Sequence, residues 1–508
     1  METSAQRSKT TTRFKNPTVK KLLEEYKPLY ALDHAESIMD WDLETYMPKE
    51  GTEGRSVASS QITLIHQKFF LDDNFKNLVL RANEIDGLND YERGVVRVLN
   101  RTLKVMNLPP KLLEEQSIAS TKAFTAWQEA REKSDFKLFA PHLDDIIRIQ
   151  REMADKLGYE KHPYDALADL YEEGMTVEKL DKIFSNLIPV LGKILGSLDQ
   201  SSPFVKSSKL EQVPYNKEQM RIVNEELLKL MGFDFGKFRM DVSAHPFTIA
   251  ISPSDVRITT RYEGVDFKKS MSTTIHEAGH AIYNLQMDPL IAGTPLFAGT
   301  SFGIHESQSG FLENMIGRSR EFVHLVTPML KNNFGFLEDY TEEDLYYYFN
   351  TVKRTPIRTE ADELTYNFHI ALRYELEKAI MDGKVSTNEL PELWNSRMED
   401  YLGIRPKDDK EGILQDVHWT DGFGYFPTYS LGNIVAGVII GKAKKEIQDF
   451  DKNVRAGNLM QIKEWLRVKI HRFGGVYAPQ ELLRRSFDED YNPNYLTDYL
   501  EKKYLHSG

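Results

Sequence analysis

Over most of the chain, apolar residues recur at three- and four-residue steps, with charged residues between them. This spacing puts the apolar residues on one side of an α-helix, so it predicts long amphipathic helices that bury one face. Helical spacing returns after residue 262 and continues to the C-terminus, with irregular loops near 290–303 and 403–428. The helices predicted before residue 238 cover residues 18–41, 54–82, 91–105, 111–133, 136–157, 176–198 and 216–231.

The pattern changes between residues 238 and 262. The segments FRMDVS, FTIAIS and VRITTRY are short, rich in β-branched residues and alternating, and turn-forming sequences separate them. This pattern favours a small antiparallel meander. No internal repeat, low-complexity block or flexible linker interrupts the chain. We therefore expect one mainly α domain over residues 1–508 with a small antiparallel β-sheet. Two lobes around a groove fit the same pattern, although the sequence marks no boundary.

Residues 422–441 carry no charged side chain. Only 434–440 is strongly apolar, which is too short to cross a bilayer, so we expect a buried helix there. The first 21 residues are polar and basic without an apolar stretch, so we expect no signal peptide.

Composition narrows the class of protein. Hydrophobic residues make up 41% and charged residues 28% of the chain, as is typical of a globular protein in water. The net charge of −12 disfavours binding to nucleic acid or to anionic membranes. The absence of cysteine excludes disulfides, thiolate metal ligands and cysteine nucleophiles. These features predict a cytoplasmic protein with neither nucleic acid nor a membrane as partner.

The sequence His276-Glu277-Ala278-Gly279-His280 carries the strongest chemical signal. On a helix, residues four apart differ by ~40° in direction and ~6 Å along the axis, so both imidazoles can reach one ion at ~2.0–2.1 Å. Glu277 can then act as a general base toward a water molecule at the metal. The alternative is a pair of surface histidines, but chance gives only roughly 0.03 such motifs in a chain of this length and histidine content.

A catalytic zinc ion needs three protein ligands and an open position. The extended motif with a third histidine fails, because Tyr283 stands at its glycine position and Gln286 at its histidine position. A downstream glutamate is the other common solution, and Glu306 lies near the start of a predicted helix. His305 is a competing ligand, or a group that orients a ligand. The alternative for Glu306 is a solvated carboxylate near a helix start.

Six short motifs follow one another in a fixed order. They are His245-Pro246-Phe247, Asp255-Val256-Arg257-Ile258-Thr259, the 276–280 motif, His305-Glu306-Ser307-Gln308, Ile357-Arg358-Thr359-Glu360-Ala361-Asp362 and Gly412-Ile413-Leu414-Gln415-Asp416-Val417-His418-Trp419. With these motifs the chain resembles the thermostable metallocarboxypeptidases of the Taq carboxypeptidase type, metallopeptidase family 32. Trp41-Asp42 and Met47-Pro48 resemble the same family, so the resemblance spans nearly the whole chain.

The resemblance implies a large helical fold with a deep active-site groove. It also implies one divalent metal ion held by His276, His280 and Glu306, with zinc usual and cobalt active in some members. The implied activity is the removal of single residues from the free C-termini of peptides, with broad specificity. Members of the family are typically homodimers.

An enzyme that trims C-termini must recognise a free carboxylate, and the planar fork of arginine binds a carboxylate with two hydrogen bonds. Arg358 is the first candidate by its place in the family motif, and Arg257 is the second. The alternative for either is a structural ion pair, above all for Arg257 beside Asp255.

Donors to the developing oxyanion and to the leaving group are expected from a loop near the metal. The Gly-rich aromatic stretch 422–429 supplies tyrosines whose phenols can donate, and two histidines of the family motifs are further candidates. The alternative is that these side chains only pack the wall of the groove, whereas Gln415 and Asp416 are expected to support the site. The candidate donors are Tyr425, Tyr429, His245 and His418.

Three hypotheses follow. The first is a metallocarboxypeptidase. The second is a zinc oligopeptidase or dipeptidyl carboxypeptidase with the same chemistry and a different substrate register. The third is a helical metal-binding protein without catalysis, which Glu277 disfavours because a structural metal site needs no base and is usually closed by four protein ligands.

Overall fold

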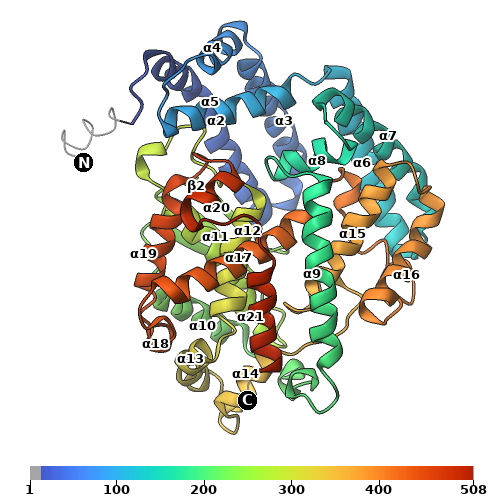
Figure 1. Cartoon of the computed structure of the whole chain (residues 1–508), viewed down its shortest axis with the longest axis vertical. Coiled ribbons are helices and arrows are strands. Elements are labelled where there is room, and N and C mark those ends of the chain that lie inside the picture. The colour runs from blue at the N-terminus through green and yellow to red at the C-terminus, as the bar shows by residue number, and fades with distance from the viewer. Residues whose placement is uncertain (1–12, 507–508) are drawn as a thin grey trace. The chain divides into compact units, whose positions relative to one another are not determined.

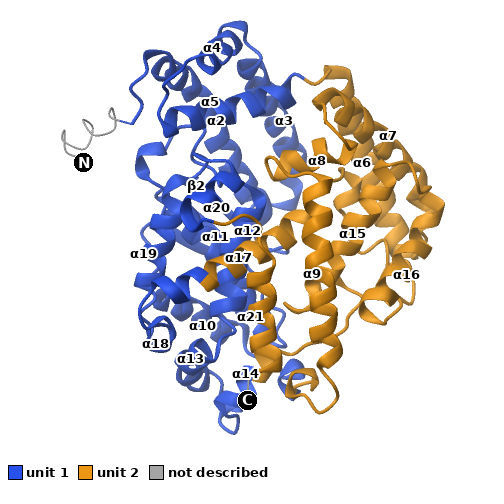
Figure 2. Ribbon diagram, in the orientation of Figure 1, with its two compact units in different colours: residues 1–107, 209–346, 442–488 blue, residues 108–208, 347–441, 489–508 orange. Residues whose placement is uncertain are grey.

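The computed structural model describes residues 13–506, and most of them are helical (Figure 1). The described chain divides into two compact units, each assembled from three separate stretches of sequence (Figure 2). The first unit holds residues 13–107, 209–346 and 442–488, and the second holds 108–208, 347–441 and 489–506. The prediction of a single mainly α domain over residues 1–508 stays a prediction, and so does its alternative of two lobes around a groove.

The first unit contains a small sheet and most of the short helices. The strands are β1 (Phe238–Val242), β2 (Thr248–Ser252) and β3 (Asp255–Thr260). Its helices are α2 (Pro17–Thr45), α3 (Thr52–Phe70), α4 (Asp73–Asn83), α5 (Asp90–Met106), α10 (Lys217–Leu230), α11 (Phe267–Leu285), α12 (Phe302–Gly310), α13 (Arg320–Asn333), most of α14 (Glu342–Phe349), α18 (Phe450–Arg455), α19 (Met460–Lys469) and α20 (Pro479–Phe487).

The second unit contains helices and loops, with no strand among its described residues. Its α17 is buried along most of its length, and Gly437 lies so close to the start of α21 that a Cβ there would stand 2.6 Å from the Leu496 nitrogen. The helices are α6 (Pro110–Lys133), α7 (Ala140–Leu157), α8 (Pro163–Tyr171), α9 (Val177–Ser197), α15 (Tyr366–Met381), α16 (Leu390–Leu402), most of α17 (Pro427–Glu446) and α21 (Asn494–Leu505).

The predicted helices are confirmed, except that the structure breaks one of them into two. The segment 54–82 was expected to be a single helix, but α3 ends at Phe70 and α4 begins at Asp73. Asp72 causes the break, because its carboxylate accepts hydrogen bonds from the Asn74 and Phe75 amides and caps α4. Local side-chain capping thus prevails over the apolar periodicity that runs through the junction.

The small sheet lies where the sequence places it, but the all-antiparallel arrangement is wrong. β3 is central, with β2 antiparallel on one edge and β1 parallel on the other. The loop 243–247 crosses the end of β3, where the Ser243 amide donates to the Thr260 carbonyl and the Thr259 amide to the Phe247 carbonyl. β2 therefore forms the connection between two parallel neighbours.

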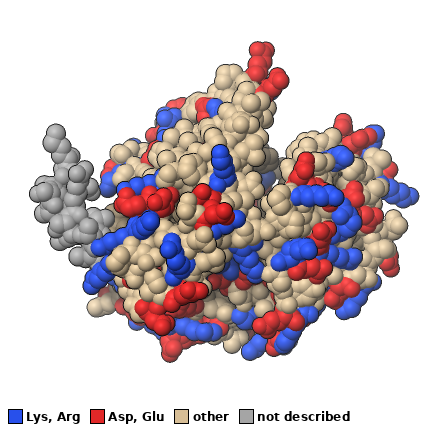
Figure 3. All heavy atoms as spheres, turned by 90° about the horizontal axis from the view of Figure 1, so that it is seen from above, with Lys and Arg blue, Asp and Glu red and all other residues tan. Residues whose placement is uncertain are grey.

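The buried helix predicted within 422–441 is α17. Across residues 13–506, no helix is both long and apolar enough to span a bilayer. On the face drawn in Figure 3, acidic and basic side chains are interspersed and do not gather into a basic stripe.

Candidate active site

Helix α11 carries the two motif histidines on a framework of buried residues. Met271, Ile275 and Ile282 face the interior of the first unit, and α11 packs against α10, α12 and β3. Gly279 lies at the contact with α12, where a Cβ would stand 2.5 Å from the Gln308 carbonyl oxygen. Only glycine permits this approach, which brings α12 across the histidines.

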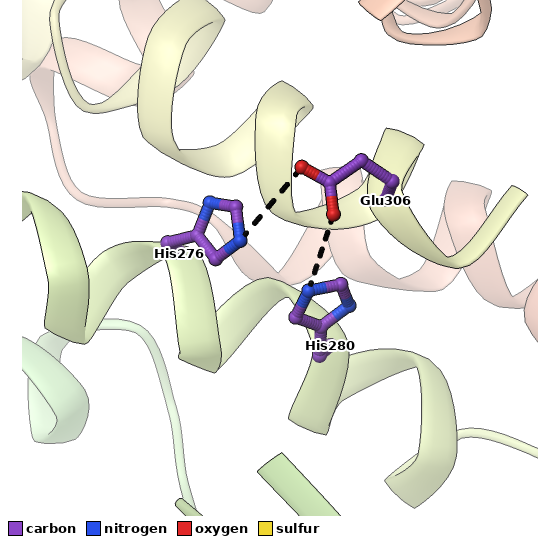
Figure 4. Close-up of side chains that lie close together, drawn as sticks. All are labelled: His276, His280 and Glu306. Carbon is purple, nitrogen blue, oxygen red and sulfur yellow. Dashed lines mark ion pairs between the residues drawn. The ribbon is translucent and has the colours of Figure 1, made fainter. Parts of the chain in front are cut away.

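Glu306 of α12 lies over both histidines (Figure 4). Its Oε1 is 3.9 Å from His276 Nε2, and its Oε2 is 3.7 Å from His280 Nε2. Two atoms that each lie ~2.1 Å from one ion are at most about 4.2 Å apart, so both separations fit a shared metal. Within residues 13–506 this is the one group of three potential ligands whose donor atoms all lie within 4.8 Å of one another.

His276 is oriented by a carboxylate that sequence reasoning missed. Its Nδ1 lies 3.0 Å from Glu313 Oε2, and Glu313 also pairs with Arg318. Burial would raise the pKa of Glu313, but Arg318 and His276 outweigh it and lower that pKa to about 2. The ionised Glu313 accepts a hydrogen bond from Nδ1, which turns Nε2 toward Glu306. Burial would lower the pKa of His276, but Glu306 and Glu313 outweigh it and raise that pKa to about 10, so a metal ion binding at Nε2 would replace a proton there.

His280 is oriented by a second histidine. Its Nδ1 lies 2.7 Å from His305 Nδ1, and His305 Nε2 lies 3.3 Å from Asn284 Oδ1. Burial lowers the pKa of His305 to about 4, so its ring is neutral and carries one proton. The consistent arrangement has His280 donating to His305 and His305 donating to Asn284, which leaves His280 Nε2 unprotonated. His305, the competing ligand candidate, thus lies outside the group of ligand atoms.

Glu277 points from α11 toward the sheet and is buried. Its Oε2 accepts a 2.6 Å hydrogen bond from Thr248, which sequence reasoning missed because 29 residues separate the two. Burial raises the pKa of the Glu277 carboxyl, and His276 and the Thr248 hydroxyl oppose that rise. A raised pKa suits a group that takes up a proton and returns it.

Two further candidates lie near the sheet. Arg257 makes two hydrogen bonds of 2.8 Å to Asp255 and lies over the Trp41 ring, 5.5 Å from its centroid. The Arg257 guanidinium is thus already paired with a carboxylate, as expected if this arginine forms a structural ion pair. His245 is exposed on the loop between β1 and β2, and its ring makes no hydrogen bond to a described residue.

Arg358 lies in the second unit in a buried cluster of charges. Its Nε and Nη2 donate to Asp416 Oδ1 at 3.0 and 2.8 Å, and its Nη1 donates to the Tyr366 hydroxyl. Arg373, which the sequence did not single out, is fully buried and donates to the other oxygen of Asp416. Burial would raise the pKa of Asp416, but the two arginines hold it well below its usual range. Two guanidinium groups and one carboxylate give these three residues one net positive charge.

The aromatic candidates gather beside this cluster in the second unit. The His418 ring stacks on Tyr425 with centroids 5.6 Å apart, and Tyr429 meets Tyr425 edge-on at 5.3 Å. The Arg358 guanidinium lies 5.2 Å from the Tyr429 ring centroid. Gln415 accepts a 2.8 Å hydrogen bond from the Arg358 amide, in the supporting position expected of it.

The loop that carries these rings is held by Glu377, another residue that the sequence did not single out. This buried carboxylate accepts hydrogen bonds from the Tyr164 hydroxyl, the Trp419 indole and the Gly424 amide at 2.7, 2.9 and 3.1 Å. Gly424 has φ +100°, and a Cβ there would stand 2.7 Å from Leu167. Burial raises the pKa of Glu377 to about 7. No local pattern identifies such a residue, because its donors come from two segments that are distant from it in the sequence.

Comparison with known proteins identifies the family. The family model of the carboxypeptidase Taq (M32) metallopeptidases matches residues 21–504. The chain belongs to this family. It is therefore a metal-dependent carboxypeptidase, as the ordered motifs predict, and its three converging ligand atoms suit the divalent metal that the family uses.

The relatives of this M32 carboxypeptidase match it over nearly its whole length. Thermostable carboxypeptidase 1 of Pyrococcus furiosus is 46% identical over 97% of this chain and 99% of its own. Carboxypeptidase 1 of Bacillus subtilis is 38% identical over 96% of this chain and 97% of its own. Among solved structures, the Pyrococcus furiosus carboxypeptidase superposes with a TM-score of 0.96 at 46% identity, covering 97% of this chain and 100% of that one. The M32 carboxypeptidase of Deinococcus radiodurans superposes with a TM-score of 0.92 at 29% identity, covering 97% of this chain and 99% of that one.

Proposed function

We propose that this M32 carboxypeptidase releases single amino acids from the C-termini of peptides, with broad specificity. The metal ligands in this proposal are His276, His280 and Glu306, and the ion is zinc, with cobalt as an active substitute. The convergence of these three side chains within 4.8 Å supports the assignment, together with the Nδ1 partners that turn both Nε2 atoms toward Glu306. A metal ion bound there would polarise the scissile carbonyl and lower the pKa of a coordinated water.

Glu277 performs the proton transfers in this proposal. It takes a proton from the attacking water and then gives it to the leaving amine. Its burial supports this role, because a carboxyl group with a raised pKa holds a proton between the two steps. Glu277→Gln should therefore lower kcat by at least about a thousandfold with the metal retained, measured by peptide hydrolysis and by metal analysis of the same sample. Substantial activity in that variant would contradict the mechanism.

Arg358 anchors the substrate carboxylate in this proposal. The net positive charge of the Arg358–Asp416–Arg373 cluster supports the choice. Arg257 is the weaker candidate, because Asp255 occupies its fork. The donors to the oxyanion and the leaving group come from Tyr425, Tyr429, His418 and His245.

The anchor is tested with paired substrates, one peptide with a free C-terminus and the same peptide as its amide. Arg358→Met should lose most of the preference for the free acid, whereas Arg257→Met should keep it, and metal content should be unchanged in both. Asp416 retains Arg373 in the first variant, so its charge stays paired. A preserved preference in Arg358→Met would remove Arg358 from this role.

We further propose that the enzyme is a cytoplasmic homodimer that uses neither nucleic acid nor a membrane as partner. The family resemblance supports the dimer, and the net charge and lack of cysteine support the rest. Light scattering of the purified protein tests the dimer directly.

The overall activity is tested by digestion of a defined peptide with mass analysis of the products over time. Stepwise loss of single C-terminal residues is expected, which stops with a chelator and returns with added zinc or cobalt. Release of dipeptides or internal fragments would instead identify a dipeptidyl carboxypeptidase or an oligopeptidase.

A further inference from the structure

Thr248, the first residue of β2, contacts Glu277 twice. Its Oγ1 lies 2.6 Å from Oε2 of the Glu277 side chain and 3.1 Å from the Glu277 carbonyl oxygen. A separation of 2.6 Å lies in the range of a charge-assisted hydrogen bond from a hydroxyl to a carboxylate. Among the described residues, no hydrogen bond reaches the other carboxylate oxygen, Oε1. The contact therefore fixes one oxygen and leaves the other available for a proton.

The position of Thr248 is itself fixed by the sheet. It pairs with Ile258 of β3, and the loop before it is tied down by two hydroxyl groups. The Phe247 amide donates to Thr259 Oγ1 at 3.0 Å, Thr259 lies 2.7 Å from Ser243 Oγ, and Ser243 donates to the His245 carbonyl at 2.7 Å. A catalytic side chain is held accurately when its partners are themselves rigid.

We propose that Thr248 is a positioning residue, whose hydroxyl group holds the Glu277 carboxylate in the orientation that proton transfer requires. This inference rests on the proposed role of Glu277 as general base. It also gives the motifs around His245 and Thr259 a physical role, because both hold the loop that leads into Thr248.

Two substitutions separate the hydroxyl group from the shape of the side chain. Thr248→Val keeps the shape and removes the donor, whereas Thr248→Ser keeps the donor. A hydrogen bond to a charged group corresponds to roughly a ten- to hundredfold effect. We expect Thr248→Val to lower kcat by that factor with KM and metal content unchanged, and Thr248→Ser to stay within about threefold of the parent enzyme.

Thr260→Val is the matched control. Thr260 also joins the sheet to α11, through a 3.0 Å contact between its hydroxyl and that of Thr274, but it does not touch Glu277. If Thr248 serves only to attach the sheet to the helix, both valine variants will lower the melting temperature and neither will change kcat. That result, or a serine variant as impaired as the valine variant, would overturn the inference.

Glu277→Gln, measured alongside, distinguishes the positioning role of Thr248 from the general-base role of Glu277. An inactive Glu277→Gln with a fully active Thr248→Val would refute the positioning role and leave the general base in place. An active Glu277→Gln would refute the general base, and the positioning role with it.

Discussion

At the scale of single residues, the site depends on groups that orient the proposed ligands. Glu313 and His305 each accept a hydrogen bond from the Nδ1 atom of a motif histidine, so each sets which nitrogen faces Glu306. Loss of a hydrogen-bond partner of this kind typically lowers metal affinity or activity by roughly 10- to 100-fold. Glu313 should orient His276 more strongly than His305 orients His280, because the Glu313 carboxylate places a full negative charge beside the ring.

Replacement of Glu313 by glutamine tests this orientation. The amide is no longer charged, so its hold on His276 Nδ1 weakens, and metal affinity should fall roughly 10- to 100-fold. Competition with a chelator of known affinity measures the change. Glu338→Gln is the control, because Glu338 is exposed and should leave affinity unchanged. Unaltered affinity in Glu313→Gln would show that His276 does not need its partner.

Glu377 predicts how stability depends on pH. Its folded pKa, raised to about 7, lies above the ordinary value of 4.5, so the folded state binds more protons than the unfolded state between these values. The contribution of Glu377 to the free energy of unfolding is therefore fully present below about pH 4.5 and is lost as pH rises through 7. Between pH 5 and 8, the free energy of unfolding of the parent enzyme should fall by up to about 3 kcal/mol relative to that of Glu377→Gln. Denaturant unfolding of both proteins measures this difference. A gain over that range would contradict the raised pKa.

At the scale of elements, the site is the product of close contacts between α11, α12 and β2. Gly279 lets α12 lie directly on α11, and the hairpin of β2 and β3 presses Thr248 against the same helix. The π-helical turn Phe311–Ile316 directly after α12 carries Glu313. Single π-helical turns are frequent at functional sites.

Gly279→Ala should separate α11 from α12. The added Cβ meets backbone atoms of Gln308 and Ser309 at 2.5 Å, so it should cost about 1–3 kcal/mol in unfolding free energy and weaken metal binding by moving Glu306. Gly192→Ala in α9 is the control. Nothing lies within 4 Å of its Cβ, and alanine there should stabilise by up to about 1 kcal/mol. Denaturant unfolding and chelator competition give the two readouts.

At the scale of the whole molecule, the proposed ligands all belong to one compact unit, while Arg358 and the aromatic loop belong to the other. Each unit is built from three stretches of the chain, so neither corresponds to a continuous half of the sequence. The metal is thus expected to stabilise one unit in particular.

Removal of the metal tests this division. A ligand at 100 times its Kd stabilises the state that binds it by about 2.7 kcal/mol. Hydrogen exchange with and without zinc should therefore show added protection in α11, α12 and their neighbours in the first unit. Amides of α9 and α15 in the second unit should change far less. Equal protection throughout both units would show that they unfold as one.

The sequence alone determined what is local or carried by a motif. Periodicity predicted the helices, and the four-residue spacing of His276 and His280 predicted a shared metal, because both follow from the geometry of one helix. Family motifs led to Glu306 and Arg358. Only the tertiary structure decided the parallel pairing of β1 and the contacts of Thr248, Glu313, Arg373 and Glu377. Those contacts join residues far apart in the chain, and their geometry is fixed by packing rather than by any repeating local pattern.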